Sequence, residues 1–170
     1  LQVHTVFNPF FNVADNLASC WMAREHMRGD FLILNSDTLF EPALCERLLA
    51  APDAPITLAV DRKDAYDSDD MKVVLQGTRL REIGKAIDLD RVDAESIGMI
   101  RFCSDGPALF AEMLDQIMHT PNSLSWWYLK AIGVLAEKVD VQTQLISGLT
   151  WCEIDFPHDL DRARVLFEAG

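Results

Sequence analysis

The sequence of 170 residues lacks the features that mark a membrane or secreted protein. No apolar run approaches the roughly 18 residues that a membrane-spanning helix needs. No secretory signal is visible among the first residues either. We therefore expect no membrane partner for this chain.

Positive charge is also scarce in this sequence. The chain has 15 Lys and Arg residues against 27 Asp and Glu residues, and its formal net charge is −12. A nonspecific nucleic-acid binder needs a basic surface to match the phosphate backbone, so this balance argues against a nucleic-acid partner. It does not argue against a single bound nucleotide, because metal ions and a few lysines can offset the charge locally.

The few cysteines stand too far apart to form a paired metal-ligand motif. Each lies in an apolar or helix-like segment, so we expect buried free thiols. Such thiols favour a reducing, cytoplasmic location. The residues concerned are Cys20, Cys45, Cys103 and Cys152.

No glycine-rich phosphate-binding loop is evident among the eight glycines. The segment from Gly77 to Gly84-Lys85 superficially resembles a Walker motif. However, six residues separate its glycines where four are needed, and Ala86 stands at the position that requires Ser or Thr. The segment is better explained as two strands joined by a turn at Gly77-Thr78.

Strand-like and helix-like segments alternate along the chain, which predicts an α/β layered fold. No repeat, low-complexity stretch or linker divides them, so we expect one domain over residues 1–170. The expected strands cover residues 3–7, 31–35, 56–60, 71–76, 80–84, 96–103, 141–146 and 151–154. The expected helices cover residues 17–27, 42–49, 107–119, 125–137 and 157–168.

Two acidic sites stand where short apolar strands end. The apolar run of residues 31–34 leads into Asp37, and the late strand carries Glu153 and Asp155 at its end. Ligands of open α/β sheets bind beyond the carboxyl ends of the strands, so these acids can face one crevice and hold a divalent metal for phosphate chemistry. The alternative is that Asp37 and Asp155 only cap the helices that follow them.

Five motifs in order resemble the nucleotidyltransferase family. They are Asn35-Ser36-Asp37, Met71-Lys72-Val73, Ile83-Gly84-Lys85, the segment Ser96–Phe102, and the segment Trp151–Asp155. Within the family, they are most similar to the cytidylyltransferases that activate phosphocholine, aminoethylphosphonate or inositol phosphate. The resemblance implies a Rossmann-like mixed, mostly parallel sheet flanked by helices, with the hairpin as an insertion.

The resemblance also implies a reaction and a metal. In the family, the phosphate or phosphonate of a small acceptor attacks the α-phosphorus of a nucleoside triphosphate and expels pyrophosphate. The closest likeness favours CTP as the donor. Asp37 would be catalytic by binding Mg²⁺, and Glu153 and Asp155 would supply further ligands.

Two lysines and a glycine of these motifs are expected in the substrate site. The resemblance places Lys85 as a catalytic lysine on the acceptor's phosphate, with help there from Lys72, and Gly98 among the substrate-binding residues. A compact ammonium suits the neutralisation of an oxyanion. The alternative for Lys85 is a solvated hairpin end.

Three adjacent aromatic residues bear on the choice of acceptor. Trp126, Trp127 and Tyr128 cannot all face one side of a helix, because neighbours point about 100° apart. One or two could form a box for a quaternary ammonium by cation–π attraction, or all could belong to the core. The acidic loop, residues 61–70, could attract a cationic headgroup or merely be solvated. Together they favour an amino-alcohol phosphate or aminophosphonate over a neutral sugar phosphate.

The chain departs from the family at its start. The opening strand and glycine-rich loop that hold the triphosphate and base are missing, so we expect an N-terminally truncated domain that is inactive alone. Two alternatives stay open, a sugar-1-phosphate nucleotidyltransferase and a non-catalytic binding module of the same fold. The base, the acceptor and the assembly, with a homodimer as one candidate, also stay open.

Overall fold

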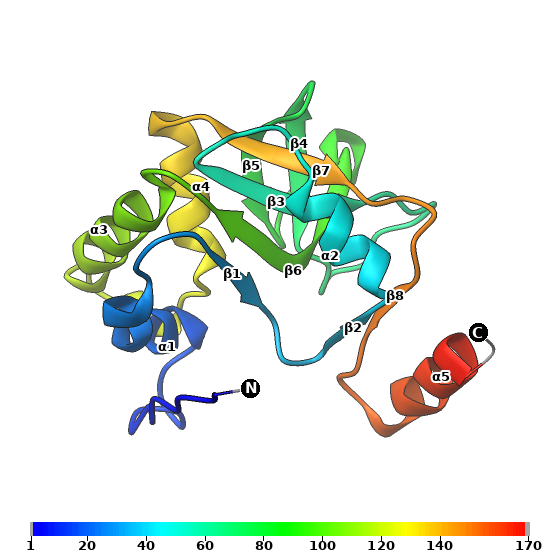
Figure 1. Cartoon of the computed structure of the whole chain (residues 1–170), viewed down its shortest axis with the longest axis horizontal. Coiled ribbons are helices and arrows are strands. Elements are labelled where there is room, and N and C mark those ends of the chain that lie inside the picture. Colours follow the sequence, from blue (N-terminus) through cyan, green and yellow to red (C-terminus); the bar gives the residue numbers. More distant parts are fainter. Residues whose placement is uncertain (1, 169–170) are drawn as a thin grey trace.

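The computed structural model describes residues 2–168, which form a central sheet with helices on both faces (Figure 1). Its strands are β1 Phe31–Leu34, β2 Thr38–Phe40, β3 Ile56–Asp61, β4 Lys72–Gln76, β5 Arg79–Gly84, β6 Ala94–Phe102, β7 Val141–Leu145 and β8 Trp151–Glu153. Its α-helices are α1 Asn16–Ala23, α2 Pro42–Leu49, α3 Gly106–Met118, α4 Leu129–Lys138 and α5 Pro157–Glu168. Short 3₁₀ turns cover Arg24–His26, Leu89–Arg91 and Ser123–Ser125.

The main sheet is mixed, and the expectation that it would be mostly parallel is wrong for the described residues. Its order is β1-β6-β3-β7-β5-β4, and β4 also pairs with β6. Of these pairs, β3–β7 is parallel and the others are antiparallel. The hairpin β4–β5 is present as expected. Alternation of helices and strands does not fix strand direction, and short connections such as the hairpin turn join only antiparallel neighbours.

The expected strand at residues 3–7 is not formed. This segment runs over the surface without regular structure, and Val3 and Phe7 are 79% and 74% exposed. A strand needs a neighbour for its backbone hydrogen bonds, and no described strand lies beside this segment. Its apolar pattern alone was therefore a poor predictor.

The larger part of the core lies on one face of the sheet, beneath α1, α3 and α4 (Figure 1). Phe102 of β6 stacks on Phe31 of β1 at 4.6 Å between ring centroids, and Phe110 of α3 lies 4.7 Å from the same ring. Full burial of a side chain such as Phe102 contributes about 2–3 kcal/mol. This packing holds the middle of the sheet rigid.

The other face of the sheet is covered by α2. Leu44 and Leu48 pack on Ile97 and Met99 of β6, so β6 is buried on both faces. Arg101, also on β6, donates hydrogen bonds to three carbonyls at the end of α2, from Leu49, Ala51 and Pro52. The fourth motif, the segment Ser96–Phe102, thus serves packing at this end.

Two further findings concern the expectations about the membrane and about the cysteines. No helix among residues 2–168 is long and apolar enough to cross a membrane. The four cysteines are free thiols, but only Cys152 is fully buried, and the other three are partly exposed. The expectation of buried thiols is therefore wrong for these three.

Candidate functional site

A second, two-stranded sheet brings the two acidic segments together. β2 pairs antiparallel with β8, with Thr38 opposite Glu153, and the backbone N–H of Ile154 donates to the carbonyl of Asp37 at 2.9 Å. The three residues of β2 were not predicted as a strand. Because of this pairing, Asp37 lies beside Glu153 and Asp155 although the segments are far apart in the sequence.

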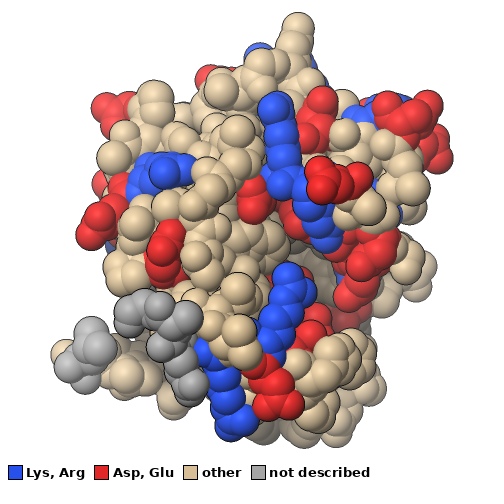
Figure 2. Space-filling view, turned by 90° about the vertical axis from the view of Figure 1, so that its right-hand side faces the viewer, with Lys and Arg blue, Asp and Glu red and all other residues tan. Residues whose placement is uncertain are grey.

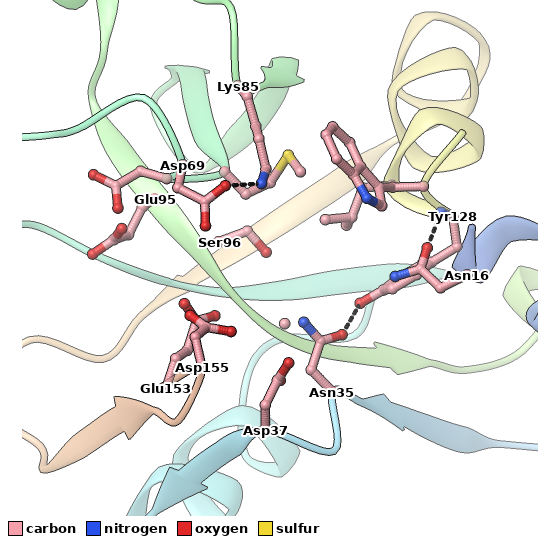
Figure 3. A pocket seen from close by; sticks show the side chains of 15 residues that line it. Asn16, Asn35, Asp37, Asp69, Lys85, Glu95, Ser96, Tyr128, Glu153 and Asp155 are labelled. Atoms are coloured by element: carbon pink, nitrogen blue, oxygen red, sulfur yellow. Dashed lines mark hydrogen bonds and ion pairs between the residues drawn. The ribbon is translucent and has the colours of Figure 1, made fainter. Parts of the chain in front are cut away.

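These acids line a cleft of about 180 Å³ between the small sheet, the main sheet and the start of α4 (Figure 3). Figure 3 shows Asp37, Glu153 and Asp155 on one wall and Lys85 on the other. The predicted site residues in the lining are Asp37, Lys85, Gly98, Trp127, Tyr128, Glu153 and Asp155. The structure therefore brings most of the expected site into one cavity.

The acidic wall concentrates negative charge. The pKa of Glu153 is raised to about 7, mainly by withdrawal from water and in part by the nearby carboxylates of Asp155 and Asp37. Figure 2 shows acidic side chains around a hollow on this side of the molecule, with basic side chains reaching between them. Such a cluster favours a bound cation, which would offset the like charges.

The alternative of helix capping does not account for these acids. Glu41, not Asp37, is the residue that directly precedes α2. At the start of α5, the carboxylate of Asp159 accepts the backbone N–H groups of Asp155 and Phe156, at 3.2 and 2.9 Å. The side chains of Asp37 and Asp155 therefore remain available to the cleft.

The donor set fits a magnesium ion only in company with a substrate. Among residues 2–168, no three His, Cys, Asp or Glu side chains are close enough to hold a metal by themselves. Mg²⁺ usually takes one or two protein carboxylates and completes its shell with phosphate oxygens and water. Asp37, Glu153 and Asp155 supply carboxylates of that kind on a single wall.

The two lysines have different positions. Lys85 follows β5 directly, and its side chain enters the cleft, where Nζ contacts Asp69 and lies 4.5 Å from the centroid of the Trp127 ring. Lys72 does not line the cleft, and it is only 2% exposed. Its ammonium instead donates to the carbonyls of Asp70 and Lys85, at 3.3 and 3.0 Å. Lys72 is thus buried behind the site, so its expected contact with substrate finds no support.

Gly98 allows the close approach of β6 to the loop after β1. Its φ is +73°, and a Cβ there would stand 2.4 Å from the side-chain nitrogen of Asn35. The backbone N–H of Asn35 donates to the carbonyl of Gly98 at 2.9 Å. Only glycine satisfies both constraints, so this residue fixes the position of Asn35 in the cleft.

The three aromatic residues precede α4 in a non-helical segment, because the helix expected from residue 125 begins only at Leu129. Trp127 is 42% exposed and lines the cleft, whereas Trp126 packs against the core and lines a neighbouring apolar groove instead. Tyr128 is buried, and its hydroxyl donates to Oδ1 of Asn35 at 3.1 Å. Burial raises the pKa of this phenol, so it stays protonated as a donor. Among the described residues, no box of several aromatic rings is formed, and Trp127 is the one ring that offers its face to Lys85.

Sequence reasoning missed several residues of the cleft. Asn16 accepts the backbone N–H of Tyr128 at 2.9 Å and joins α1 to the site. Glu95 is 5% exposed, and burial raises its pKa to about 7 although Lys63 lies 3.0 Å away. The pair Glu95-Ser96 at the start of an otherwise apolar strand was the available signal for this wall of the cleft.

Comparisons with known proteins add to this geometry. No protein-family model matches the chain. The chain is 42% identical over 59 residues to CMP-5'-(3-aminopropyl)phosphonate synthase of Streptomyces rubellomurinus, a match that covers 35% of the chain and 9% of the relative. It is 25% identical over 152 residues to a bifunctional IPC transferase and DIPP synthase of Aquifex aeolicus, covering 88% of the chain and 32% of the relative. The chain therefore spans a third or less of these curated relatives.

Solved structures share the fold. The inositol-1-phosphate CTP transferase from T. maritima superposes with a TM-score of 0.74 at 18% identity, over 95% of this chain and 64% of that one. The CTP:phosphocholine cytidylyltransferase from Streptococcus pneumoniae gives 0.68 at 14% identity, over 94% and 67%. UDP-glucose pyrophosphorylase from Acinetobacter baumannii gives 0.58 at 10% identity, over 91% and 62%. The resemblance to nucleotidyltransferases is thus confirmed, and the fold is theirs.

Proposed function

We propose that this chain forms the acceptor-binding and metal-binding part of a nucleotidyltransferase. The enzyme would transfer a nucleotidyl group, CMP from CTP, to a small acceptor that carries a phosphate or phosphonate. The observation that carries the proposal is the pairing of β2 with β8, which places Asp37, Glu153 and Asp155 opposite Lys85 in one cleft. The fold, the two solved CTP-using relatives and the CMP-aminopropylphosphonate synthase agree with it.

The proposed chemistry needs positioning and charge neutralisation rather than a protein nucleophile. An oxygen of the acceptor's phosphate forms a bond to the α-phosphorus, the bond from that phosphorus to the bridging oxygen breaks, and pyrophosphate leaves with the electron pair. The acceptor is already ionised at neutral pH, so no base is required. Lys85 would bind the acceptor's oxyanion and hold it in line for attack.

The carboxylate wall would hold Mg²⁺ together with the nucleotide's phosphates. Asp37 would be one ligand, and Glu153 or Asp155 a second. When bound, the ion would screen the negative charge that gathers on the phosphorus oxygens. Before then, these carboxylates repel a triphosphate, so nucleotide binding should require the divalent cation.

The acceptor is proposed to carry a cation as well as a phosphate. Carboxylates outnumber the single lysine in the lining of the cleft, with Asp69, Asp70 and Glu95 on the side away from β8. Trp127 presents an exposed ring face to the same space. An amino-alcohol phosphate or an aminophosphonate matches this surface, and the aminopropylphosphonate synthase relative is consistent with it.

The test is pyrophosphate release by the full-length protein with Mg²⁺ and each nucleoside triphosphate. Phosphocholine, aminoethylphosphonate, inositol phosphate and glucose-1-phosphate would be compared as acceptors. We expect turnover with CTP and a cationic acceptor, and a loss on the order of 100-fold in Asp37→Asn, because a metal ligand is removed. Asp53→Asn, an exposed acid outside the cleft, should keep full activity.

Each other outcome selects an alternative. Turnover with glucose-1-phosphate alone would replace the proposal by a sugar-1-phosphate nucleotidyltransferase, the activity that the more distant structural relative represents. Absence of pyrophosphate release with every acceptor and nucleotide would contradict catalysis and favour a binding module of the same fold. Equal loss in Asp37→Asn and Asp53→Asn would remove Asp37 from the metal site.

A further inference from the structure

In this structure, the lysine expected to receive the acceptor's phosphate is already paired. Nζ of Lys85 contacts a carboxylate oxygen of Asp69, which belongs to the acidic loop, residues 61–70. The same ammonium stands 4.5 Å from the centroid of the Trp127 ring. Figure 3 shows the pair spanning the upper side of the cleft. In the free protein, the ammonium of Lys85 is therefore paired with the carboxylate of Asp69 and lies over the ring face of Trp127.

The loop backbone is fixed while the Asp69 carboxylate is not. Oδ1 of Asp67 accepts the backbone N–H groups of Asp69 and Asp70, at 2.7 and 3.2 Å. Asp70 in turn pairs with Lys63 at 2.7 Å. The Asp69 side chain is 78% exposed, and Lys85 is its one ionic partner among the described residues. An ion pair this exposed contributes little to stability, so a ligand can displace it.

Displacement has different consequences for different acceptors. A phosphate that takes Lys85 leaves the Asp69 carboxylate unpaired beside a new anion, which is unfavourable. It also leaves the face of Trp127 without its cation. An acceptor that carries an ammonium group can fill both vacated positions, because a cation is attracted to the carboxylate and to the ring. A purely anionic acceptor can fill neither.

We propose that Asp69 is a specificity-determining residue whose ionic partner changes when the acceptor binds. In the free protein it neutralises Lys85, and in the complex it neutralises the acceptor's ammonium while Lys85 neutralises the phosphate. An acceptor without a cation binds poorly, because it takes Lys85 away from Asp69 and leaves that carboxylate unpaired. This inference rests on the proposed function only for the identity of the acceptor site.

The test compares two acceptors that differ in the cation. Phosphocholine and glycerol 3-phosphate would be assayed with CTP and Mg²⁺ in the full-length wild type, in Asp69→Asn and in Asp64→Asn. Asp64 lies in the same loop, is exposed and does not line the cleft, so its substitution changes the net charge equally. The measured quantity is the ratio of kcat/KM for phosphocholine to that for glycerol 3-phosphate.

We expect the ratio to fall about tenfold in Asp69→Asn, mainly through a lower KM for glycerol 3-phosphate, and to be unchanged in Asp64→Asn. A wild type that turns over acceptor while Asp69→Asn keeps the same ratio would overturn the inference and leave the proposed function standing. If no acceptor reacts, the affinity for phosphocholine, measured by calorimetry, tests the inference without turnover. Equal affinities of the wild type and Asp69→Asn would then overturn it.

Discussion

At the scale of single residues, the cleft depends on a close contact between the backbone of β6 and the side chain of Asn35. Gly98 lies against Asn35, and Asn35 in turn accepts the hydroxyl of Tyr128. These residues form the floor between the acidic wall and the start of α4. A change of one methyl group at Gly98 should therefore disturb both stability and the site.

We predict that Gly98→Ala lowers the free energy of unfolding by roughly 2–5 kcal/mol, from left-handed strain and overpacking against Asn35. The matched control is Gly77→Ala, because Gly77 has a similar φ of +64° but open space around it. That variant should lose only about 1 kcal/mol, from strain alone. Urea denaturation measures both, and equal losses would show that the contact with Asn35 is unimportant.

Several residue assignments could be made from sequence because their positions follow strand ends. Asp37 and Glu153 each stand at or just after a short apolar run, so their place at a cleft was predictable, whereas Lys85 was assigned through the family resemblance. Lys72 was not, because its neighbours in sequence give no sign that its ammonium is turned onto the carbonyl groups of Asp70 and Lys85. The pairing of Lys85 with Asp69 depends on how a polar loop folds back, which no periodicity encodes.

At the scale of elements, the position of β2 decides the geometry of the acidic wall. The buried hydroxyl of Thr38 donates to the carbonyl of Ile97 at 3.3 Å and so ties the small sheet to β6. The helix α2 and the hairpin were predictable from an N-terminal proline and from a change of period. β2 was not, because a strand of three residues carries no pattern and acquires its partner only from the far end of the chain.

We predict that Thr38→Val costs roughly 1–2 kcal/mol of stability, because it removes the buried hydrogen bond from Thr38 to the carbonyl of Ile97. It should also reduce kcat, since Asp37 is adjacent to the lost tie. Thr57→Val is the control: Thr57 is 1% exposed, and its hydroxyl has no hydrogen-bond partner among the described residues. Its replacement should be neutral or stabilising in a thermal melt. Equal changes of stability in the two variants would show that the hydrogen bond from Thr38 to Ile97 is unimportant.

At the scale of the whole molecule, acid groups with raised pKa set the response to pH. Both Glu95 and Glu153 have pKa values of about 7 in the folded protein, against an ordinary value of 4.5 for glutamate. The folded state therefore binds more protons than the unfolded state between these limits. Stability from these groups is fully present below pH 4.5 and is lost as the pH rises through 7.

We predict that Glu95→Gln removes part of this dependence. Relative to the variant, the wild type should lose roughly 2–3 kcal/mol of unfolding free energy between pH 4.5 and pH 8, because its buried carboxyl must ionise. Denaturant titrations at several pH values measure the difference. A constant difference between the two proteins across this range would show that Lys63 keeps the Glu95 carboxylate charged throughout.

The pairing of β2 with β8 also has a consequence for the order in which the molecule is made. The ribosome delivers Asp37 early, whereas the strand that completes the acidic wall is delivered after every strand of the main sheet. A nascent chain that stops after β7 can assemble the main sheet but has only half of the wall. Synthesis of β8 is thus the step that completes the acidic wall.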